Sequence, residues 1–448
     1  MRIAYLVHFY PPSPCGGAGN HTASLAETFQ KGGADVGVLC VDRWGQGDRY
    51  LNGQDDEVRN GVFVRRLHVN WQKAPRPFDW LYDSPMLGEQ ARLFLAEFRP
   101  DVVHVASCFT LSAGPIFVAK EMGLPVIVHL HDYWLLCARH TLLHKNDTQC
   151  SGPESAWKCQ TCLLANTKAW QGIARIHGDT SRQRLLSALG AIPWITRRRG
   201  LKGLIGDFER RRQTVLRAAE IADVLITPTD FARTLHVQHG VSNPNFIVMP
   251  NGTDIEWSRL VNRLHSAQLR IGFLGNVIPI KGVHLLVDAY RELLAGNHSV
   301  QLQIWGDPSL APEYYQALQE SSPKTVKWGG RFDKTDLPRI FSEIDVAVAP
   351  SLWYEVQPLV IQEAFAAGVP VVVSDNTSMA EGVTPERDGL HFKRGNVEDL
   401  TRQLSRLSND SGLLDKLRRG IPSVLGIDQN VGALAELYTK LIHDKRTS

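Results

Sequence analysis

Short, nearly continuous apolar runs alternate with helix-like segments along the chain, and this alternation constrains the fold more than any other feature. Strands that are apolar on both faces are typical of a parallel sheet covered by helices on each side. After residue 266 the pattern starts again, so the sequence predicts two α/β domains. The expected strands are residues 2–8, 36–41, 62–69, 101–106, 126–130, 223–227 and 245–249, then 270–274, 300–305, 326–328, 345–349 and 369–374.

A polar, strand-poor segment over residues 251–266 separates the two patterns. We therefore predict a first domain over residues 1–250 and a second over 251–430. Residues 431–448 have a helical pattern and are expected to cross back to the first domain. A length of 448 residues suits two or three domains.

The overall charge argues against a nucleic-acid partner, because 49 basic residues are nearly balanced by 46 acidic ones. No apolar run reaches the length of about 18 residues that a membrane-spanning helix needs. The apolar N-terminal run is soon interrupted by Pro11 and Pro12, which favours a buried strand over a signal peptide. The expected location is the cytoplasm.

Residues 168–217 differ from both patterns, with 12 Lys and Arg against three Asp and Glu. An apolar stretch that includes Trp194 precedes the basic run Arg197–Arg199. Such a combination suits anionic lipid head groups, which favours a peripheral position on the inner membrane face. A solvated helical insertion with a charged face is the alternative interpretation.

Residues 345–374 read as strand, loop, helix and strand. Pro358 is predicted at the first helical position, where its missing N–H would have no partner in any case. The helix would then begin just after Glu355, at the carboxyl edge of a parallel sheet, where ligands bind in such folds. Free N–H groups near Leu359 and Val360 are suited to receive a phosphate.

Glu363 follows Glu355 by eight residues, and Gly368 suits the end of the helix. The carboxylate of Glu363 is expected to accept hydrogen bonds from a ribose diol, and that of Glu355 to hold hydroxyls of a sugar. This region resembles the retaining glycosyltransferases of family 4. Their signature is two glutamates separated by seven residues, between a strand ending in Pro-Ser and a helix followed by Gly-x-Pro-Val.

The resemblance implies the GT-B fold, in which two Rossmann-like domains with parallel sheets face each other across a cleft. It also implies transfer of a hexosyl unit, with retention of configuration, from a UDP- or GDP-linked sugar to a glycan or lipid-linked acceptor. The acceptor would attack from the side of the leaving group, and a phosphate oxygen would take its proton. No Asp-x-Asp pair is well placed, so no catalytic metal is expected.

The loop from Gly275 to Gly282 resembles the diphosphate-binding loop of that family, and Lys281 matches its lysine. Asn276 stands where the family has an arginine, so one cation is missing. Arg331 is a candidate substitute. The resemblance thus implies that Lys281 acts on the leaving group.

On the acceptor side, Gly16 and Gly17 follow the first strand and resemble the Gly-Gly loop of the family, where backbone approaches a ligand closely. His131 aligns with a strand-end histidine and would sit over the donor sugar. Together with Glu355 and Lys281 it is the expected catalytic set. His104 and His129 are interpreted as core groups with satisfied hydrogen bonds.

Four cysteines fall within 26 residues, in the order Cys137, Cys150, Cys159 and Cys162. Four thiolates bind tetrahedral zinc, and the Cys-x-x-Cys pair provides half of such a site. The spacing fits no well-known zinc finger, so free thiols and a redox function stay open beside a structural zinc.

Two other functions compete with the transferase. A nucleotide-sugar epimerase shares the architecture and would change its substrate without an acceptor. A catalytically silent nucleotide-sugar-binding partner would account for Asn276. A phosphorylase is less favoured, because the sequence shows no context for a cofactor-binding lysine.

Overall fold

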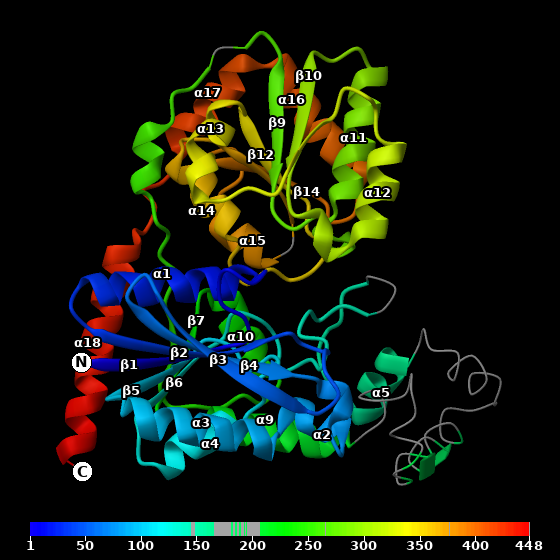
Figure 1. Ribbon diagram of the computed structural model, residues 1–448. Helices are drawn as coiled ribbons and strands as arrows, with labels where there is room; N and C mark the ends of the chain where they lie inside the picture. The colour runs from blue at the N-terminus through cyan, green and yellow to red at the C-terminus, as the bar shows by residue number, and fades with distance from the viewer. Residues whose placement is uncertain are drawn as a thin grey trace. The chain divides into compact units, whose positions relative to one another are not determined.

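The computed structural model describes residues 1–144, 148–164, 207–264, 266–375 and 377–447, with isolated positions between 181 and 194. The chain divides into two compact units (Figure 1). The first unit contains Met1–Pro250 and Asp428–Ser448, and the second contains Asn251–Ile427. Most of the basic segment predicted over residues 168–217 lies outside the described residues.

The first unit is built on an eight-stranded sheet with the order β3-β4-β2-β1-β5-β6-β7-β8. Its neighbouring strands are parallel except at the edge, where β3 runs antiparallel to β4. The expected parallel sheet is confirmed, and β3 is an additional edge strand that its polar residues did not predict. The strands are β1 (Arg2–Val7), β2 (Asp35–Asp42), β3 (Leu51–Arg59), β4 (Val62–Val69), β5 (Val102–Val105), β6 (Val126–His129), β7 (Val224–Thr227) and β8 (Phe246–Val248).

Helices cover both faces of this sheet, as the doubly apolar strands predict. Figure 1 shows α1 on one face and α3, α4 and α9 on the other. The described helices of this unit are α1 (Gly17–Lys31), α2 (Pro77–Tyr82), α3 (Pro85–Phe98), α4 (Gly114–Glu121), α5 (Ala156–Leu164), α9 (Phe208–Ile221), α10 (Asp230–Gln238) and α18 (Ile427–Thr447), with the short η1 (Trp71–Lys73).

The terminal helix α18 packs against the core of the first unit (Figure 1). The hydroxyl of its buried Tyr438 lies 2.5 Å from Nδ1 of His104 and 3.2 Å from the hydroxyl of Tyr5. The Tyr438 ring also stacks on Phe29 of α1, with 5.4 Å between ring centres. Through Tyr438, helix α18, which follows the second unit in the sequence, is therefore attached to β1, β5 and α1 of the first unit.

The second unit has a six-stranded, fully parallel sheet with the order β11-β10-β9-β12-β13-β14. Its strands are β9 (Leu269–Leu274), β10 (Val300–Trp305), β11 (Lys327–Gly330), β12 (Val346–Ala349), β13 (Val371–Ser374) and β14 (Gly389–Phe392). Its helices are α11 (Val283–Ala295), α12 (Pro312–Ser321), α13 (Leu337–Ser342), α14 (Leu359–Ala366), α15 (Thr377–Gly382), α16 (Val397–Asn409) and α17 (Ser411–Gly420). The short helices are η2 (Glu256–Leu260), η3 (Pro279–Lys281), η4 (Pro308–Leu310) and η5 (Lys334–Asp336).

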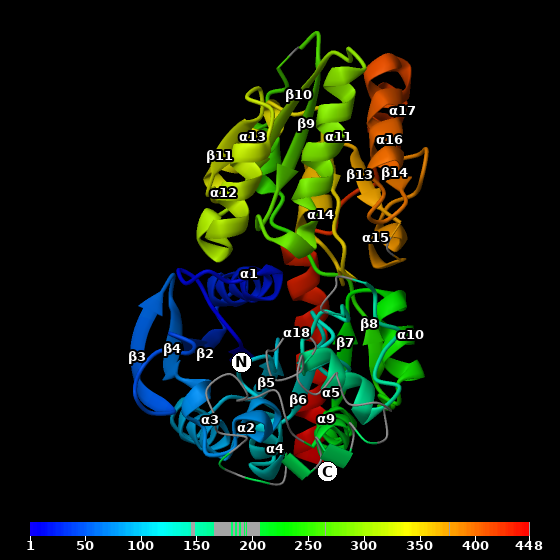
Figure 2. The ribbon, with the colours of Figure 1, turned by 90° about the vertical axis from the view of Figure 1, so that its right-hand side faces the viewer.

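Alternate residues of these strands enter two different cores, because side chains along a strand point to opposite faces. Val346 and Val348 of β12 pack with α11 and α16, which lie side by side in Figure 2. Ala347 and Ala349 pack with α13 and α14 on the opposite face. The sheet is therefore buried on both faces. The loops that follow its strands, such as those after β9 and β12, extend from the carboxyl ends of these buried strands.

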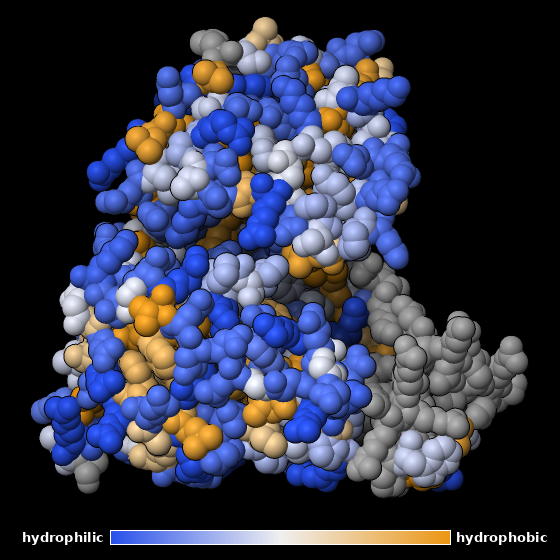
Figure 3. Space-filling model, viewed as in Figure 1, coloured by the Kyte–Doolittle hydropathy of each residue, from blue (hydrophilic) through white to orange (hydrophobic). Residues whose placement is uncertain are grey.

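None of the helices in the described ranges has both the length and the apolar character needed to cross a membrane. The face drawn in Figure 3 is largely polar, and its apolar side chains lie in small groups between polar ones. Scattered apolar residues of this kind are usual on a protein surface.

Candidate active site

The helix start predicted for phosphate binding exists, one residue later than expected. Helix α14 begins at Leu359, and Pro358 is its N-cap with φ −67° and an extended ψ of 121°. The prediction of Pro358 at the first helical position was therefore wrong, because the chain stays extended through Pro358. No side chain caps this helix, whose first turn contains Leu359 and Val360. Gly368 has a φ of +68°, and as predicted it follows the end of the helix.

An ion pair lies directly before this helix. Nζ of Lys281 is 2.5 Å from Oε1 of Glu355, and the hydroxyl of Ser351 donates to the same oxygen at 2.7 Å. Glu355 is only 5% exposed. A buried carboxylate is costly unless it is paired and hydrogen-bonded, so Lys281 and Ser351 hold the Glu355 carboxylate in place.

The backbone brings the two loops of this pair together. Lys281 lies in η3 after β9, and the loop after β12 approaches it at Pro350. Gly282 has a φ of +68°, and a Cβ at this position would lie 2.0 Å from the carbonyl oxygen of Pro350. The N–H of Leu352 donates to the carbonyl of Ile280 at 2.8 Å. Only glycine fits at position 282, which explains the residue that follows Lys281.

Glu363 lies in the second turn of α14 and is partly buried. Burial raises the pKa of Glu363 to about 7, and the positive charge of Lys334 opposes this rise. Near neutral pH this carboxyl group therefore exists in both protonation states. A ligand that donates hydrogen bonds to Glu363 would favour the ionised form.

The proposed substitute cation lies on the same edge of the sheet but apart from the ion pair. Arg331 follows β11, and its Nη1 is 3.9 Å from Oδ2 of Asp307, which follows β10. The arginine side chain is 66% exposed. Among the described residues, no hydrogen bond or ion pair joins Arg331 to Lys281 or Glu355. Asn276 follows Gly275, which has a φ of +145° at the end of β9.

In the first unit, the predicted glycine loop leads into α1. Gly16 is the N-cap of α1 and Gly17 its first residue, and no side chain caps this helix. A Cβ added at either glycine would meet no atom within 4 Å. By contrast, a Cβ at Gly19 would lie 2.6 Å from the carbonyl oxygen of Phe9. Gly19 is therefore required for packing, whereas Gly16 and Gly17 leave space beside the helix start.

His131 follows β6 and lies in a cluster of imidazoles. Its ring stacks on His129 with 3.9 Å between ring centres, and the ring of His21 on α1 is 5.3 Å away. One ring nitrogen from each of the three lies within 4.8 Å of the others. Burial lowers the pKa of His131 well below its usual range, and the charge of His21 lowers it further. Burial likewise lowers the pKa of His129, so His129 and His131 are both neutral at physiological pH.

The expectation that His129 is a satisfied core residue was wrong. It is 1% exposed, but neither ring nitrogen has a hydrogen-bond partner among the described residues. His104 fits the expectation better, since its Nδ1 pairs with Tyr438, but its Nε2 is also without a described partner. Buried imidazole nitrogens without partners are unusual and point to a polar group that the chain itself does not supply.

The four cysteines of the predicted zinc site are all in the free thiol form. Cys137 and Cys150 lie in the turns that precede α5, and Cys159 and Cys162 lie on α5. All four are partly buried. Zinc binding stays a prediction.

Three neighbours of the predicted site residues were missed by the sequence analysis. Ser351 donates a hydrogen bond to Glu355, and the ring centre of Trp353 lies 5.7 Å from Nζ of Lys281. The ring of His21 lies next to that of His131. Ser351 follows Pro350 directly in the strand-end motif, so its place there was a usable signal. No comparable signal marks His21, which is one polar residue within an amphipathic helix.

Comparison with known proteins agrees with this geometry. The family model for glycosyl transferases group 1 matches residues 256–423, and that for a glycosyl transferase 4-like domain matches residues 16–194. The chain is 26% identical to an uncharacterised glycosyltransferase of Methanocaldococcus jannaschii, over 92% of this chain and 90% of that one. It is 24% identical to a GDP-mannose-dependent alpha-mannosyltransferase of Mycobacterium tuberculosis, over 89% of this chain and 85% of that one.

Among solved structures, HepE of Anabaena in complex with UDP-glucose is similar in fold. The TM-score is 0.64 at 16% identity, covering 98% of this chain and 100% of that one. The two family models together match most of the chain, one in each unit. The chain is therefore a glycosyltransferase of the family 4 type, with the GT-B fold.

Proposed function

We propose that this glycosyltransferase moves a hexosyl unit from a nucleoside diphosphate sugar to a glycan acceptor, lipid-linked in the cell, with retention of configuration. The observation that carries the proposal is the buried ion pair between Lys281 and Glu355 beside the uncapped start of α14. This arrangement places an anion-binding helix end, a cation and a hydrogen-bond acceptor at one edge of a parallel sheet.

Lys281 and the first turn of α14 are proposed to bind the diphosphate. When the glycosidic bond breaks, negative charge grows on the leaving group, and donors already in position stabilise it best. The N–H groups of Leu359 and Val360 supply such donors, and Lys281 supplies a full positive charge. Arg331 is proposed to add the second cation that Asn276 cannot provide.

Glu355 is proposed to orient the donor sugar through one oxygen. Both of its hydrogen bonds in the described structure go to Oε1, from Lys281 and Ser351. Oε2 makes no bond with the described residues, so it is free to accept from a sugar hydroxyl. Glu363 is proposed to accept from the ribose hydroxyls in the same way.

In the first unit, His131 is proposed to act on the donor sugar as a neutral imidazole, since its Nε2 has no partner among the described residues. The acceptor hydroxyl would attack the anomeric carbon as the bond to the diphosphate oxygen breaks, and its proton would pass to a phosphate oxygen. Gly16 and Gly17 would let the ligand approach the start of α1. No catalytic metal takes part in this scheme.

The donor base is proposed to be uracil or guanine, because one relative is named for GDP-mannose and HepE was solved with UDP-glucose. We further propose that the basic segment over residues 168–217 binds anionic lipid on the cytoplasmic face, next to the acceptor. Liposomes with and without anionic lipid test this second part by co-sedimentation. Absent binding, or binding that salt does not weaken, contradicts it.

Three incubations test the function itself: nucleotide sugar alone, nucleotide sugar with lipid extract, and the same mixture with Glu355→Gln. We expect release of nucleoside diphosphate and a labelled lipid product only in the second incubation. An altered nucleotide sugar in the first would indicate an epimerase. Nucleotide binding without turnover in any mixture would indicate the silent partner and would contradict the proposal.

A further inference from the structure

Three histidines of the first unit, here called the histidine cluster, bring their ring nitrogens together. His21 lies on α1, whereas His129 ends β6 and His131 follows it. One ring nitrogen from each lies within 4.8 Å of those of the other two, and the described part of the chain holds no other group of three histidine, cysteine or carboxylate side chains that converges in this way. His21 and His129 are only 2% and 1% exposed. Converging imidazoles of this kind are typical ligands of a transition metal.

Two of these rings have nitrogen atoms that the described residues do not use. Both ring nitrogens of His129 and Nε2 of His131 are buried there without a hydrogen-bond partner. A neutral imidazole has one N–H and one lone pair, and the lone pair accepts a hydrogen bond or binds a metal. A buried polar atom without a partner costs about 1–3 kcal/mol, so an ion bound at these nitrogens would recover part of that cost.

The third ring is oriented by a side chain of α18. Nε2 of His21 lies 3.2 Å from Oδ1 of Asn430, and Nδ2 of Asn430 donates to the carbonyl oxygen of Pro250 at 3.2 Å. Because the amide nitrogen of Asn430 is directed to Pro250, its oxygen faces the imidazole, and this oxygen can only accept. In the neutral ring, Nε2 therefore carries the hydrogen and Nδ1 carries the lone pair. Histidines that bind metals usually donate their other N–H to an oxygen in this way, which fixes the tautomer and the ring.

The three rings need only a small adjustment to bind one ion. Two nitrogens bound to one tetrahedral ion at about 2.0–2.1 Å lie about 3.4 Å apart, so nitrogens now within 4.8 Å of each other must approach by at most about 1.4 Å. The ring of His21 is inclined by 88° to that of His129 and by 64° to that of His131. The rings of His129 and His131 are inclined by only 29°, so one of them must turn. The last side-chain torsion of histidine is broad and permits such a turn.

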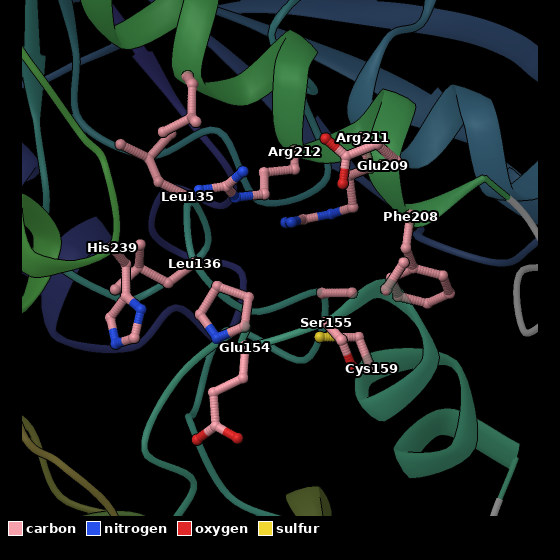
Figure 4. Close-up of a pocket in the computed structure, with 14 residues that line it drawn as sticks. Leu135, Leu136, Glu154, Ser155, Cys159, Phe208, Glu209, Arg211, Arg212 and His239 are labelled. Atoms are coloured by element: carbon pink, nitrogen blue, oxygen red, sulfur yellow. The ribbon is translucent and has the colours of Figure 1, made fainter. Parts of the chain in front are cut away.

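A cavity of the same unit is less suited to a cation. Cys159 lines this cavity of about 150 Å³ together with Arg211 and Arg212 of α9 (Figure 4). In Figure 4 the guanidinium group of Arg211 points into the open space between the labelled side chains. Arg211 is only 6% exposed, so water screens its charge weakly. A positive charge in the cavity disfavours a second one there, and the histidine cluster is therefore the better position for a metal ion.

We propose that His21, His129 and His131 bind one divalent transition-metal ion through one ring nitrogen each. Three imidazoles without a carboxylate suit Zn²⁺, Cu²⁺ or Ni²⁺ rather than Mg²⁺ or Ca²⁺. His131 is only partly buried, which leaves a fourth position on the ion for water. The bound ion would occupy the lone pair with which His131 is proposed to act on the donor sugar, so an occupied site inhibits the transferase. This inhibition rests on the proposed function, whereas the binding of the ion does not.

Titration calorimetry with Zn²⁺ tests the site on the full-length protein, purified without a histidine tag and stripped of metal by a chelator. His129→Leu should weaken Zn²⁺ binding by more than the roughly 10–100-fold that the loss of an outer-shell partner costs. Asn430→Ala removes such a partner of His21 and should weaken binding by about tenfold. His443→Leu, which replaces an exposed histidine of α18, is the matched control and should bind as the unmodified chain does.

Several results would overturn the proposal. Zn²⁺ affinity that stays the same in His129→Leu removes the site, and Co²⁺ that binds only with an intense sulfur-to-cobalt charge-transfer band assigns the metal to the cysteines. If His129→Leu does not fold, pulsed EPR of Cu²⁺ bound to the unmodified chain still decides, since it must show couplings to several imidazole nitrogens.

A transferase assay separates the binding from its consequence. Zn²⁺ should inhibit at the concentrations at which it binds, and a chelator should restore the rate. Binding without inhibition keeps the site and contradicts the role proposed for His131. Metal binding by a chain that transfers no sugar keeps the site and contradicts only the proposed function.

Discussion

The carboxyl edges of the two sheets hold opposite kinds of chemistry. In the second unit, Lys281 and Glu355 are charged and paired at 2.5 Å. In the first unit, His129 and His131 are neutral because burial depresses the pKa of both imidazoles. In the proposed function, the charged pair of the second unit would meet the diphosphate, and the neutral imidazoles of the first unit would meet the sugar ring as it becomes positive. A cation beside that ring would repel it, so a neutral imidazole suits the position better.

The ion pair offers the strongest test of this contrast. Lys281→Ala and Glu355→Ala should each lower kcat by roughly 10²–10³, the scale for losing one preorganised electrostatic contact. Because the two side chains interact, the double variant should lose less than the product of the single losses. Lys327→Ala, an exposed lysine of the same unit, is the matched control. Near-normal kcat in both single variants would refute the role of the pair.

Substitutions at the two neutral histidines should affect activity and stability differently from those at the ion pair. His131→Ala should lower kcat by about 10²-fold while nucleotide affinity stays within about twofold, because the nucleotide contacts are proposed in the second unit. His129→Leu should keep most activity and leave thermal stability unchanged or higher, since it replaces buried nitrogens that lack partners. Kinetics and calorimetry on both variants check this. Equal loss of activity in the two would assign the function to the cluster rather than to His131.

Glu363 provides a pH test within the second unit. The carboxyl group must be ionised to accept from both ribose hydroxyls, and its pKa is raised to about 7. Affinity should therefore be present above pH 7 and be lost as the pH falls through that value. The Kd for the nucleoside diphosphate should rise about tenfold between pH 8 and pH 6. Glu363→Gln, titrated in parallel, corrects for the phosphate group, and an identical profile in this variant would contradict the assignment.

The smallest effect is expected at the glycine loop of the first unit. Gly17→Ala should leave stability unchanged or raise it by about 0.4–1 kcal/mol, because the new methyl group meets no atom within 4 Å. It should lower kcat/KM a few-fold by entering the space proposed for ligand. Gly19→Ala is the opposite case, since its Cβ would clash with the carbonyl of Phe9, and it should cost about 1–3 kcal/mol of stability. Thermal melts and kinetics separate the two.

The sequence predicted the buried strands well, because a strand buried on both faces is visible in the sequence as a run of apolar residues. The bounds expected for β4 and β10 are those observed, Val62–Val69 and Val300–Trp305. Strand β3 was missed because it is polar and exposed, and it is held by pairs such as Arg65 with Asp56 at 2.6 Å. Such pairing depends on a neighbouring strand and leaves no apolar pattern. Strand β14 was missed because Gly389 and His391 interrupt its apolar residues, so it has no continuous apolar run.

The site residues divide in the same way, into positions that a local sequence pattern marks and contacts that only the fold creates. Glycine and proline mark the loops around Lys281 and Glu355, so these positions could be singled out from the sequence. Their contact joins residues 74 positions apart and required the structure. The place of His21 beside His131 and the lack of partners at His129 depend on how α1 packs on the sheet, which no local pattern encodes.

The chain enters the second unit and leaves it at neighbouring points. The N–H of Thr253 donates to the carbonyl of Leu425 at 3.0 Å, and the N–H of Ile427 donates back to Thr253 at 3.0 Å. A segment whose two ends lie side by side can be exchanged as a cassette without stretching the remaining chain. Grafting residues 251–427 from a relative with another nucleotide preference is thus a route to reprogram the donor while the host core, completed by Tyr438, stays intact.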